Sequence, residues 1–293
     1  MLDTLALLLT KTLGRLPLRW AQACGSFLGH LALLFNISMV KVTRRNISYC
    51  MAQLTQAERE QLVRASVLET ARLALEMPVI WCTDDTVLKG FIKNVQGLEH
   101  LEAARAAGKG LVVLAPHLGN WEVLGRYLVN IGPLISMFQP PKLVKFGEFV
   151  KAGRSRSGSG LAATDRRGLA QVISHLKSGG ITGVLPDQAP KDANSGMLAP
   201  FFGRPAFTPT FVCKLVHNLG CGAVFGYAKR VPGGFDIIFN PVPAAFYSEH
   251  LDEAVAALNE GVAQSVAQVP EQYQWEYKRF KHNGDKALYD HLQ

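Results

Sequence analysis

The sequence predicts an α/β fold in which helices sandwich a mixed β-sheet. Three observations predict it. Short apolar runs are bounded by turn residues, longer segments have helical spacing, and the two kinds of segment alternate after Gly97. The 293 residues are enough to bury a substantial core. We see no internal repeat, linker or low-complexity segment that would divide this alternating region.

The elements expected after Gly97 follow one another in a regular order. Helices are predicted at 98–107, 121–130, 167–178, 210–218 and 251–269. Strands are predicted at 111–114, 134–138, 181–185, 223–229 and 235–240. Residues 186–209 are predicted to be a turn-rich connection.

An earlier helix is predicted from its ends. Thr55 and Glu58 have the spacing of a capping box, in which each side chain bonds to the backbone N–H of the other residue. We expect this helix to end near Met77, because Pro78 lacks the N–H that the helix would need.

The first forty residues are the most hydrophobic part of the chain. No Lys, Arg, Asp or Glu occurs from Trp20 to Val40, a length that could cross a bilayer, although polar residues interrupt it. A helix in the membrane interface, a weak transmembrane anchor and a buried helical hairpin are the three alternatives. Lys41, Arg44 and Arg45 follow directly and favour the interface. Residues 1–40 are therefore predicted to be an N-terminal membrane-associated helical segment, and 41–293 one further domain.

The charge balance limits the classes of partner. The formal net charge is +8, which suits an anionic membrane surface, an acidic protein or a nucleic acid. The chain has no run of Lys and Arg and no base-reading motif, so no nucleic acid is expected.

The cysteines point to a reducing environment. Their number is odd, they are scattered, and none forms a CxxC pair: they are Cys24, Cys50, Cys82, Cys213 and Cys221. This pattern supports neither a disulfide framework nor a zinc site. We therefore expect a cytosolic environment and no bound metal.

The segment APHLGNWE, residues 115–122, carries the strongest chemical signal. A strand is predicted to end at Pro116, which places His117 in the turn at the strand's carboxyl end. Asn120 is a good N-cap and places Glu122 in the first helical turn. The turn can fold Glu122 back onto the imidazole, where a carboxylate would fix one tautomer and stabilise the imidazolium.

A histidine oriented by a carboxylate is a general base. No serine lies in a GxSxG motif and no cysteine is near in sequence, so His117 is expected to activate a substrate hydroxyl directly, without an acyl-enzyme. The alternative is structural: His117 ends a strand and Glu122 only caps a helix. Metal-dependent hydrolysis lacks a third ligand at suitable spacing.

HLGNWE resembles the H-x4-D/E signature of glycerolipid-type acyltransferases, and most closely the HxGNWE form of the lipid A biosynthesis late acyltransferase family. Further segments are similar to that family, in order along nearly the whole chain: Arg44–Ile47, Arg154–Gly158, Leu185–Pro190, Pro200–Ala206 with Thr208, and Trp275–Phe280. Two departures are a weaker N-terminal span and Tyr277 in place of an expected histidine. The resemblance implies a glycerolipid acyltransferase-like fold, with 41–293 as the acyltransferase domain.

The resemblance also implies an activity. Members of this family transfer an acyl chain from acyl-carrier protein to a hydroxyl of a lipid A precursor at the cytoplasmic face of the bacterial inner membrane, with no cofactor. His117 would deprotonate the hydroxyl and Glu122 would orient His117. Arg156 or Arg154 would stabilise the oxyanion formed on the thioester carbonyl. The alternative for these arginines is headgroup binding or a solvated loop.

The same resemblance extends the expected site. Asp187 follows a strand and can face the site together with Asn120, or it can be a simple turn carboxylate. Gly203 and Thr208 are expected to shape the substrate wall, or to be turn residues only. Acidic acyl-carrier protein, the membrane lipid acceptor and the anionic inner-membrane surface are the expected partners.

Two other functions stay open at this point. One is an acyltransferase of the same fold with a different acceptor, such as a lysophospholipid, ornithine lipid or polyene lipid. The other is a non-catalytic membrane protein that binds lipid. The pair of His117 and Glu122 argues against the second, because binding alone needs no oriented base.

Overall fold

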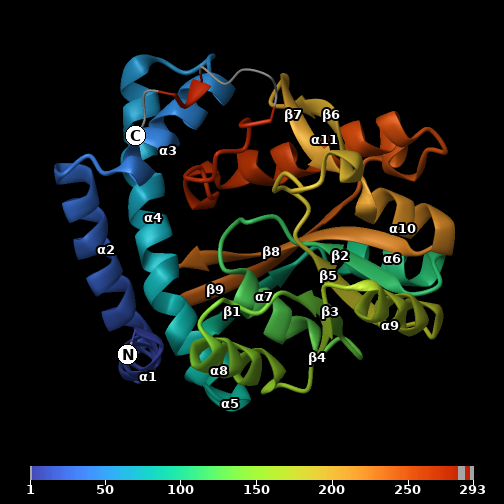
Figure 1. The fold of residues 1–293 in the computed structure, drawn as a ribbon, viewed down its shortest axis with the longest axis horizontal. Coiled ribbons are helices and arrows are strands. Elements are labelled where there is room, and N and C mark those ends of the chain that lie inside the picture. Colours follow the sequence, from blue (N-terminus) through green and yellow to red (C-terminus); the bar gives the residue numbers. More distant parts are fainter. Residues whose placement is uncertain (1, 283–287, 291–293) are drawn as a thin grey trace.

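A five-stranded mixed sheet lies at the centre of the protein, in the order β1–β9–β8–β2–β5. The computed structural model describes residues 2–282 and 288–290 and confirms the predicted α/β class (Figure 1). The five strands are β1 Ile92–Gln96, β2 Leu111–Leu114, β5 Ile181–Val184, β8 Gly222–Val231 and β9 Gly234–Pro241. β2 runs parallel to both β5 and β8, whereas β8 and β9 are antiparallel.

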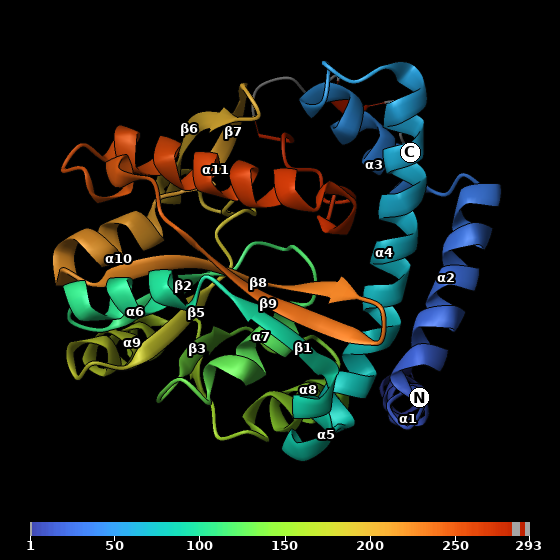
Figure 2. The same cartoon turned by 180° about the vertical axis from the view of Figure 1, so that it is seen from behind.

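Helices cover both faces of this sheet, as the alternating pattern predicted. They are α1 Leu2–Leu13, α2 Leu18–Leu34, α3 Ser38–Cys50, α4 Gln56–Cys82, α5 Asp85–Phe91, α6 Leu98–Ala107, α7 Trp121–Leu128, α8 Val144–Ser155, α9 Arg166–Lys177, α10 Phe211–Leu219 and α11 Leu251–Gln268. In Figures 1 and 2, α11 lies on one side of β8 and β9, and α7 lies on the other. The helices predicted after Gly97 are confirmed to within two residues at each end.

The core follows from the alternation of side chains along β2. Val112 and Leu114 belong to the apolar cluster on the α11 side, and Leu111 and Val113 belong to the cluster on the α7 side. All four side chains are fully buried. A strand that is apolar at every position therefore occupies the middle of the sheet, as expected for a parallel strand covered on both faces.

Two short strand pairs extend the architecture. β3 Ile135–Phe138 and β4 Gly160–Ala163 are parallel, and a bridge from Leu134 to Ile181 joins them to β5. β6 Gly196–Phe201 and β7 Arg204–Pro209 form an antiparallel hairpin inside the stretch that was predicted only as turn-rich. Phe202 and Gly203 both have positive φ, the geometry of a tight two-residue hairpin turn. Prolines within both strands concealed the hairpin in the sequence.

Helix α4 is longer than predicted. The capping box of Thr55 and Glu58 is confirmed at its start, but the helix continues through Pro78 to Cys82. Pro78, Ile80 and Trp81 are all buried. Apolar burial in this last turn offsets the hydrogen bond that proline removes, a loss of about 3 kcal/mol.

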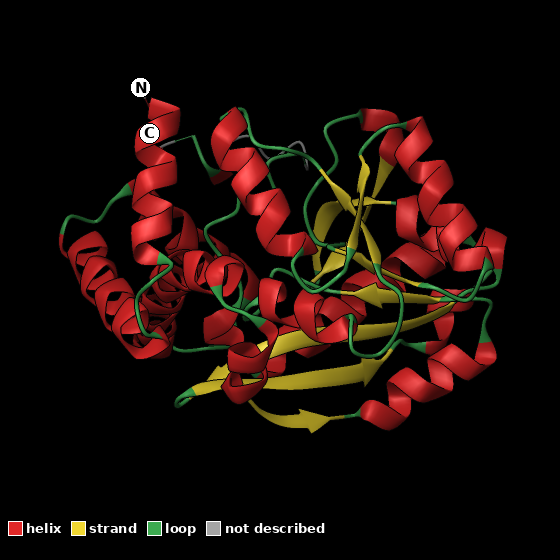
Figure 3. Cartoon of the chain, turned by 90° about the horizontal axis from the view of Figure 1, so that it is seen from below, coloured by secondary structure: helices red, strands yellow, loops and turns green. Residues whose placement is uncertain are grey.

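The first two helices pack at one end of the molecule and expose apolar side chains. Figure 3 shows the helical end that carries the N-terminus lying beside the strands. The large exposed apolar residues here are Leu2, Leu5, Leu8, Leu9, Trp20, Phe27, Leu28, Leu34 and Phe35. Within the described residues no helix alone has the length and apolarity to cross a membrane, although α2 and α3, bent by 82°, meet the criterion as a pair. The membrane association of residues 1–40 and the division at residue 40 stay predictions.

Close packing of α2 on α4 gives a test of this arrangement. A Cβ added to Gly25 would lie 2.6 Å from the Arg72 Cα, too close for the two backbones to remain in place. We expect Gly25→Ala to lower the free energy of unfolding by about 1–3 kcal/mol. Gly90→Ala in α5 is the matched control, because no neighbouring atom lies within 4 Å of the added Cβ. It should be neutral or stabilising by up to about 1 kcal/mol. Equal effects in chemical denaturation would contradict the docking of α2.

Candidate active site

His117 and Asp187 lie at the carboxyl edge of the sheet, on neighbouring parallel strands. Leu114, the last residue of β2, is paired with Val184, the last residue of β5. Each functional residue follows its strand by three positions. Because the segments after β2 and β5 leave the sheet in the same direction from paired residues, the side chains of His117 and Asp187 lie side by side.

Asp187 holds the His117 ring through one nitrogen. The Nδ1 of His117 lies 2.8 Å from Oδ1 of Asp187, and the backbone N–H of His117 donates to Oδ2 at 3.0 Å. Asp187 is only 2% exposed. Burial alone would raise the pKa of Asp187, but the adjacent His117 and its hydrogen bonds bring this pKa below its usual value. The carboxylate is therefore ionised and oriented at the ring.

Nε2, the other nitrogen of the His117 ring, points away from Asp187. Nε2 of His117 lies 3.1 Å from Nε2 of Gln188, and Trp121 packs edge-on against the ring with centroids 5.0 Å apart. An amide N–H can donate only to a ring nitrogen that carries no proton, so this contact fits a ring protonated at Nδ1. The His117 side chain is 14% exposed, so its edge is within reach of a substrate.

The turn after His117 is fixed by two distant segments. Gln274 donates its backbone N–H to the carbonyl of His117 at 3.0 Å, and Gly119 donates to the carbonyl of Gln272 at 3.0 Å. Gly119 has φ of +62°, and a Cβ there would lie 2.1 Å from the Ala228 carbonyl oxygen. Only glycine fits this position, so the turn is held between β8 and the segment after α11.

Glu122 does not contact His117, contrary to the sequence-based expectation. It is buried and accepts hydrogen bonds from Arg154, whose Nε lies 3.0 and 3.1 Å from the two carboxylate oxygens and whose Nη2 lies 2.5 Å from Oε1. Glu122 points toward α8 from the first turn of α7, whereas strand pairing delivers Asp187 to the ring. Nearness in sequence favoured Glu122 as the partner of the ring, but the contact is made by Asp187.

Glu122 and Arg154 line a cavity of about 100 Å³ between α7, α8 and the strands β3 to β5. Arg126 and two serines also line it, but most of its wall is apolar: Ala115, Trp121, Leu124, Leu128, Leu134, Met137, Leu161 and Leu185. His117 is not a lining residue, although Ala115 and Trp121 on either side of it are. The cavity therefore begins beside the His117 turn and extends away from it.

The two arginines of the basic segment have different surroundings. Arg154 stands over the Phe138 ring, 5.2 Å from its centroid, with its charge paired to Glu122. Arg156 is exposed, and its Nε contacts the Trp81 carbonyl oxygen at 3.3 Å. Of these two arginines, Arg154 lines the cavity and Arg156 does not.

The residues expected to bind substrate have structural positions: Asn120 and Thr208 are buried and hydrogen bonded within the protein, and Gly203 lies in a turn. Asn120 is fully buried, accepts the Val123 N–H as the predicted N-cap and donates to Glu76 at 3.0 Å. Gly203 lies in the β6–β7 turn. Thr208 is also fully buried, and its hydroxyl accepts hydrogen bonds from Asn259 and Arg279, each at 2.8 Å.

Other residues near His117 were missed by the sequence analysis. Tyr273 is buried close to Asp187, and burial together with this neighbouring carboxylate raises the pKa of the phenol. Burial also raises the pKa of Glu276, whose carboxylate accepts the Thr70 hydroxyl at 3.2 Å. Gln188 and Glu276 both lie in segments that resemble the family, and this was the available signal.

Tyr277, noted as a departure from the family pattern, has a role in the loop. Its hydroxyl accepts the backbone N–H of Ala189 at 3.0 Å, directly after Asp187 and Gln188. In the described part of the chain, no three His, Cys, Asp or Glu side chains are grouped so that they could hold a metal ion.

Known proteins resemble this chain over nearly its full length. Residues 1–282 match the family model described as bacterial lipid A biosynthesis acyltransferase. The lipid A biosynthesis lauroyltransferase of Escherichia coli (strain K12) is 26% identical over 267 residues, which are 90% of this chain and 86% of that protein. The E. coli lipid A biosynthesis palmitoleoyltransferase is 24% identical over 270 residues, 90% of this chain and 87% of that protein.

Another relative is named for a different lipid. The phosphatidylinositol mannoside acyltransferase of Mycolicibacterium smegmatis (strain ATCC 700084 / mc(2)155) is 33% identical over 186 residues, 60% of this chain and 59% of that protein. These matches confirm the resemblance seen in the motifs around His117 and Asp187. The chain belongs to the bacterial lipid A biosynthesis acyltransferase family, and it is an acyltransferase enzyme.

Proposed function

We propose that this enzyme transfers an acyl chain from acyl-carrier protein to a hydroxyl of a lipid A precursor, with His117 as the general base. Family membership supports acyl transfer to a lipid acceptor. The observation that carries the mechanism is the hydrogen bond from the half-buried His117 ring to the fully buried Asp187 carboxylate.

Asp187, rather than Glu122, orients the base in this proposal. It keeps the proton on Nδ1, so that Nε2 carries the lone pair. The acceptor hydroxyl takes the place of the Gln188 amide, gives its proton to Nε2 and attacks the thioester carbonyl carbon. The tetrahedral intermediate then expels the thiolate of acyl-carrier protein, which takes the proton back from Nε2. Asp187 stabilises the imidazolium between these steps.

Arg154 is the proposed oxyanion partner. Glu122 accepts hydrogen bonds from Nε and Nη2, which leaves Nη1 for a substrate oxygen. Glu122 thus orients the arginine, and its buried carboxylate keeps the guanidinium in place. The apolar cavity beside this pair is the proposed site of the acyl chain, since it accepts hydrocarbon and adjoins the turn that carries His117.

The N-terminal helices are proposed to bind the cytoplasmic face of the bacterial inner membrane. The exposed apolar side chains of α1 and α2 are accompanied by Lys11, Arg15 and Arg19 and followed by Lys41 and Arg45. Apolar faces bordered by cations bind anionic lipid surfaces. The positive charge also favours acidic acyl-carrier protein and phosphorylated acceptors.

The M. smegmatis relative favours a second candidate, in which the same chemistry acts on another lipid. Its name gives a phosphatidylinositol mannoside as the acceptor. The catalytic groups act on the ester-forming centre and are indifferent to the rest of the acceptor.

The first test is transfer from radiolabelled acyl-carrier protein to a tetra-acylated, Kdo-bearing lipid A precursor. Loss of the base in His117→Ala should lower kcat by about 100- to 10,000-fold. Asp187→Asn should lower kcat by a similar factor, because the ring is then no longer held in the Nδ1–H tautomer. Arg154→Met should lose about 100- to 1000-fold. Arg156→Met is the matched control for charge and should lose less than about tenfold, because Arg156 lies outside the cavity.

The outcomes separate the mechanism from the acceptor. Transfer that survives in His117→Ala would refute the general base. A collapse in Glu122→Gln together with a fully active Asp187→Asn would return the orienting role to Glu122. Wild-type transfer to total membrane lipid, but not to the lipid A precursor, would keep the mechanism and replace the acceptor.

A second test asks which nitrogen of His117 carries the proton. We expect NMR of isotope-labelled histidine to show the neutral ring as the Nδ1–H tautomer, because Asp187 accepts from Nδ1. The signal is assigned by its absence in His117→Gln. In Asp187→Asn the preference should weaken or reverse. An Nε2–H tautomer in the wild type would be incompatible with the base proposed here.

A third test uses Cys24 as a natural probe of the membrane-facing surface. Cys24 is exposed on α2, one turn from both Trp20 and Leu28, whereas burial raises the pKa of both Cys50 and Cys213 to about 12 and keeps them unreactive. Maleimide should label Cys24 first in solution. Vesicles of anionic phospholipid should slow this labelling several-fold, and neutral vesicles at high salt should slow it less. Unchanged labelling on vesicles that sediment with the protein would place α2 outside the interface.

A further inference from the structure

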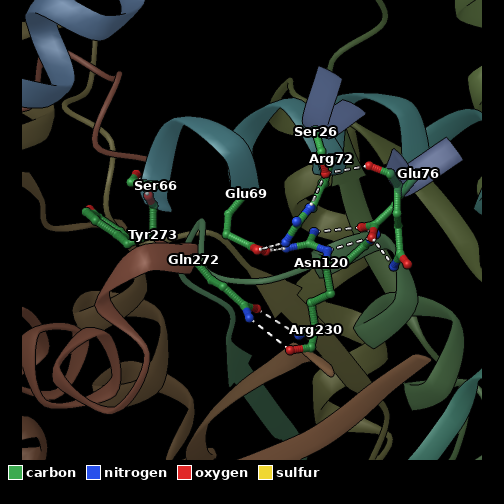
Figure 4. A network of polar contacts seen from close by, with 10 residues as sticks. Ser26, Ser66, Glu69, Arg72, Glu76, Asn120, Arg230, Gln272 and Tyr273 are labelled. Carbon is green, nitrogen blue, oxygen red and sulfur yellow. Dashed lines mark hydrogen bonds and ion pairs between the residues drawn. The ribbon is translucent and has the colours of Figure 1, made fainter. Parts of the chain in front are cut away.

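A buried polar network joins α2, α4, β8 and Asn120, the N-cap of α7 (Figure 4). Glu76 of α4 lies at its centre and is completely buried. Its Oε1 accepts from Gln22 at 2.7 Å and from Nε of Arg230 at 2.5 Å. Its Oε2 accepts from Asn120 at 3.0 Å and from Nη2 of Arg230 at 2.6 Å. Every donor comes from a different element than Glu76.

Arg230 is held on several sides. Its guanidinium is paired with Glu76 and also with Glu69, which lies nearer the start of α4 (Figure 4). Its backbone N–H donates to the Gln272 side chain at 2.7 Å, and its carbonyl accepts from that same amide at 2.9 Å. Gln272 in turn accepts from Gly119 of the catalytic turn. The network therefore reaches the turn by two routes.

The direct route passes through Asn120. Its Oδ1 caps α7, and its Nδ2 donates to Glu76. These two bonds fix which way the amide faces, because a flipped amide would present a donor to the α7 N–H and an acceptor to the carboxylate. Glu76 thus sets the orientation of a residue three positions after His117.

The network also has an end on α2. Gln22 connects this helix to Glu76, and one turn later Ser26 accepts a hydrogen bond from Arg72 at 2.7 Å. Burial alone would raise the pKa of Glu76, but Arg230, Gln22 and Asn120 together bring it below the usual value. A buried ion pair is weak evidence for stability, because apolar side chains of the same size often stabilise more. The Glu76–Arg230 pair lies between the docked helix α2 and the His117 turn, and this position points to a role in the site instead of in stability.

We propose that Glu76 is a positioning residue that couples the docking of α2 on α4 to the geometry of the His117 turn. Withdrawal of Gln22 leaves Glu76 with one fewer donor and loosens its hold on Asn120, and with it the first turn of α7. The enzyme then reaches its full rate only with α2 docked. This inference rests on the proposed role of His117 as the base.

The test compares two single substitutions one helical turn apart on α2. Gln22→Ala removes a donor to Glu76. Ser26→Ala, the matched control, removes a contact of similar kind between α2 and Arg72. Ser26 makes no contact with Glu76 itself and is connected to it through Arg72, Glu69 and Arg230, whereas Gln22 donates to Glu76 directly. We expect Gln22→Ala to lower kcat about tenfold at an unchanged KM, since the turn is needed in the transition state. Ser26→Ala should stay within about twofold of the wild type. Thermal melting of both variants controls for folding.

A second measurement needs no substrate. Hydrogen–deuterium exchange of the peptide covering residues 117–128 should accelerate about tenfold in Gln22→Ala and in Glu76→Gln, and not in Ser26→Ala. Equal exchange and equal kcat in Gln22→Ala and Ser26→Ala would overturn the coupling and leave only helix packing. If the wild type fails to transfer acyl chains, the proposed function fails, but the exchange result still decides whether Gln22 and the turn are coupled.

The double variant Gln22→Ala with Asn120→Ala completes the cycle. If both act through Glu76, the loss in the double variant is smaller than the product of the single losses. A loss that equals the product would show that Gln22 and Asn120 act independently, and the proposal would be wrong.

Discussion

His117 and Asp187 meet because β2 and β5 run parallel in one register and each strand continues for three residues to its functional side chain. In both connections a proline stands directly before that side chain, as Pro116 and as Pro186. Proline fixes its own backbone angle and restricts the residue before it, so both connections leave the sheet in a defined direction. A change of one residue in either connection would separate the His117 ring from the Asp187 carboxylate. The proposed chemistry thus depends on the pairing of two strands.

Three buried carboxylates lie near this point, and each holds a basic side chain. Asp187 accepts a hydrogen bond from the His117 ring, and Glu122 and Glu76 form ion pairs with Arg154 and Arg230. Each carboxylate belongs to a different element from its partner, so the contacts connect β5 to β2, α7 to α8 and α4 to β8 through short segments. Fixed charges in a low-dielectric interior stabilise changing charge without reorganising, which is what acyl transfer through an oxyanion requires.

Much of the fold could be predicted from local patterns, because periodicity and capping are local. The strand of four apolar residues at β2, the Asn120 cap and the Thr55 capping box are examples. The β6–β7 hairpin was missed because prolines interrupt both strands and because positive φ, as at Phe202 in the turn, is rare for a bulky residue. Helix α4 passed Pro78 because burial of the last turn outweighed propensity.

In the site, the position of His117 at the carboxyl end of a strand could be predicted, but the carboxylate that contacts its ring could not. Glu122 was favoured because it is close in sequence, whereas contact with Asp187 follows from which strands are neighbours. The matching pattern of strand, apolar residue, proline and titratable residue occurs at both positions and is the signal that could have joined them. Arg154 was singled out because it begins the segment Arg154–Gly158, which resembles the family, and its partner Glu122 could be assigned only once α7 and α8 were placed.

Glu76 and Arg230 are separated by 154 positions in the chain. During synthesis from the N-terminus, α2 and α4 are therefore complete before the cation that neutralises Glu76 exists. At about 5–20 residues per second, that interval is roughly 8 to 30 s. Throughout it, Glu76 has no Arg230 to pair with, so the polar network between α2 and α4 lacks its buried cation. The order in which the ribosome delivers these elements thus means that the network behind the His117 turn can be completed only after β8 has been made.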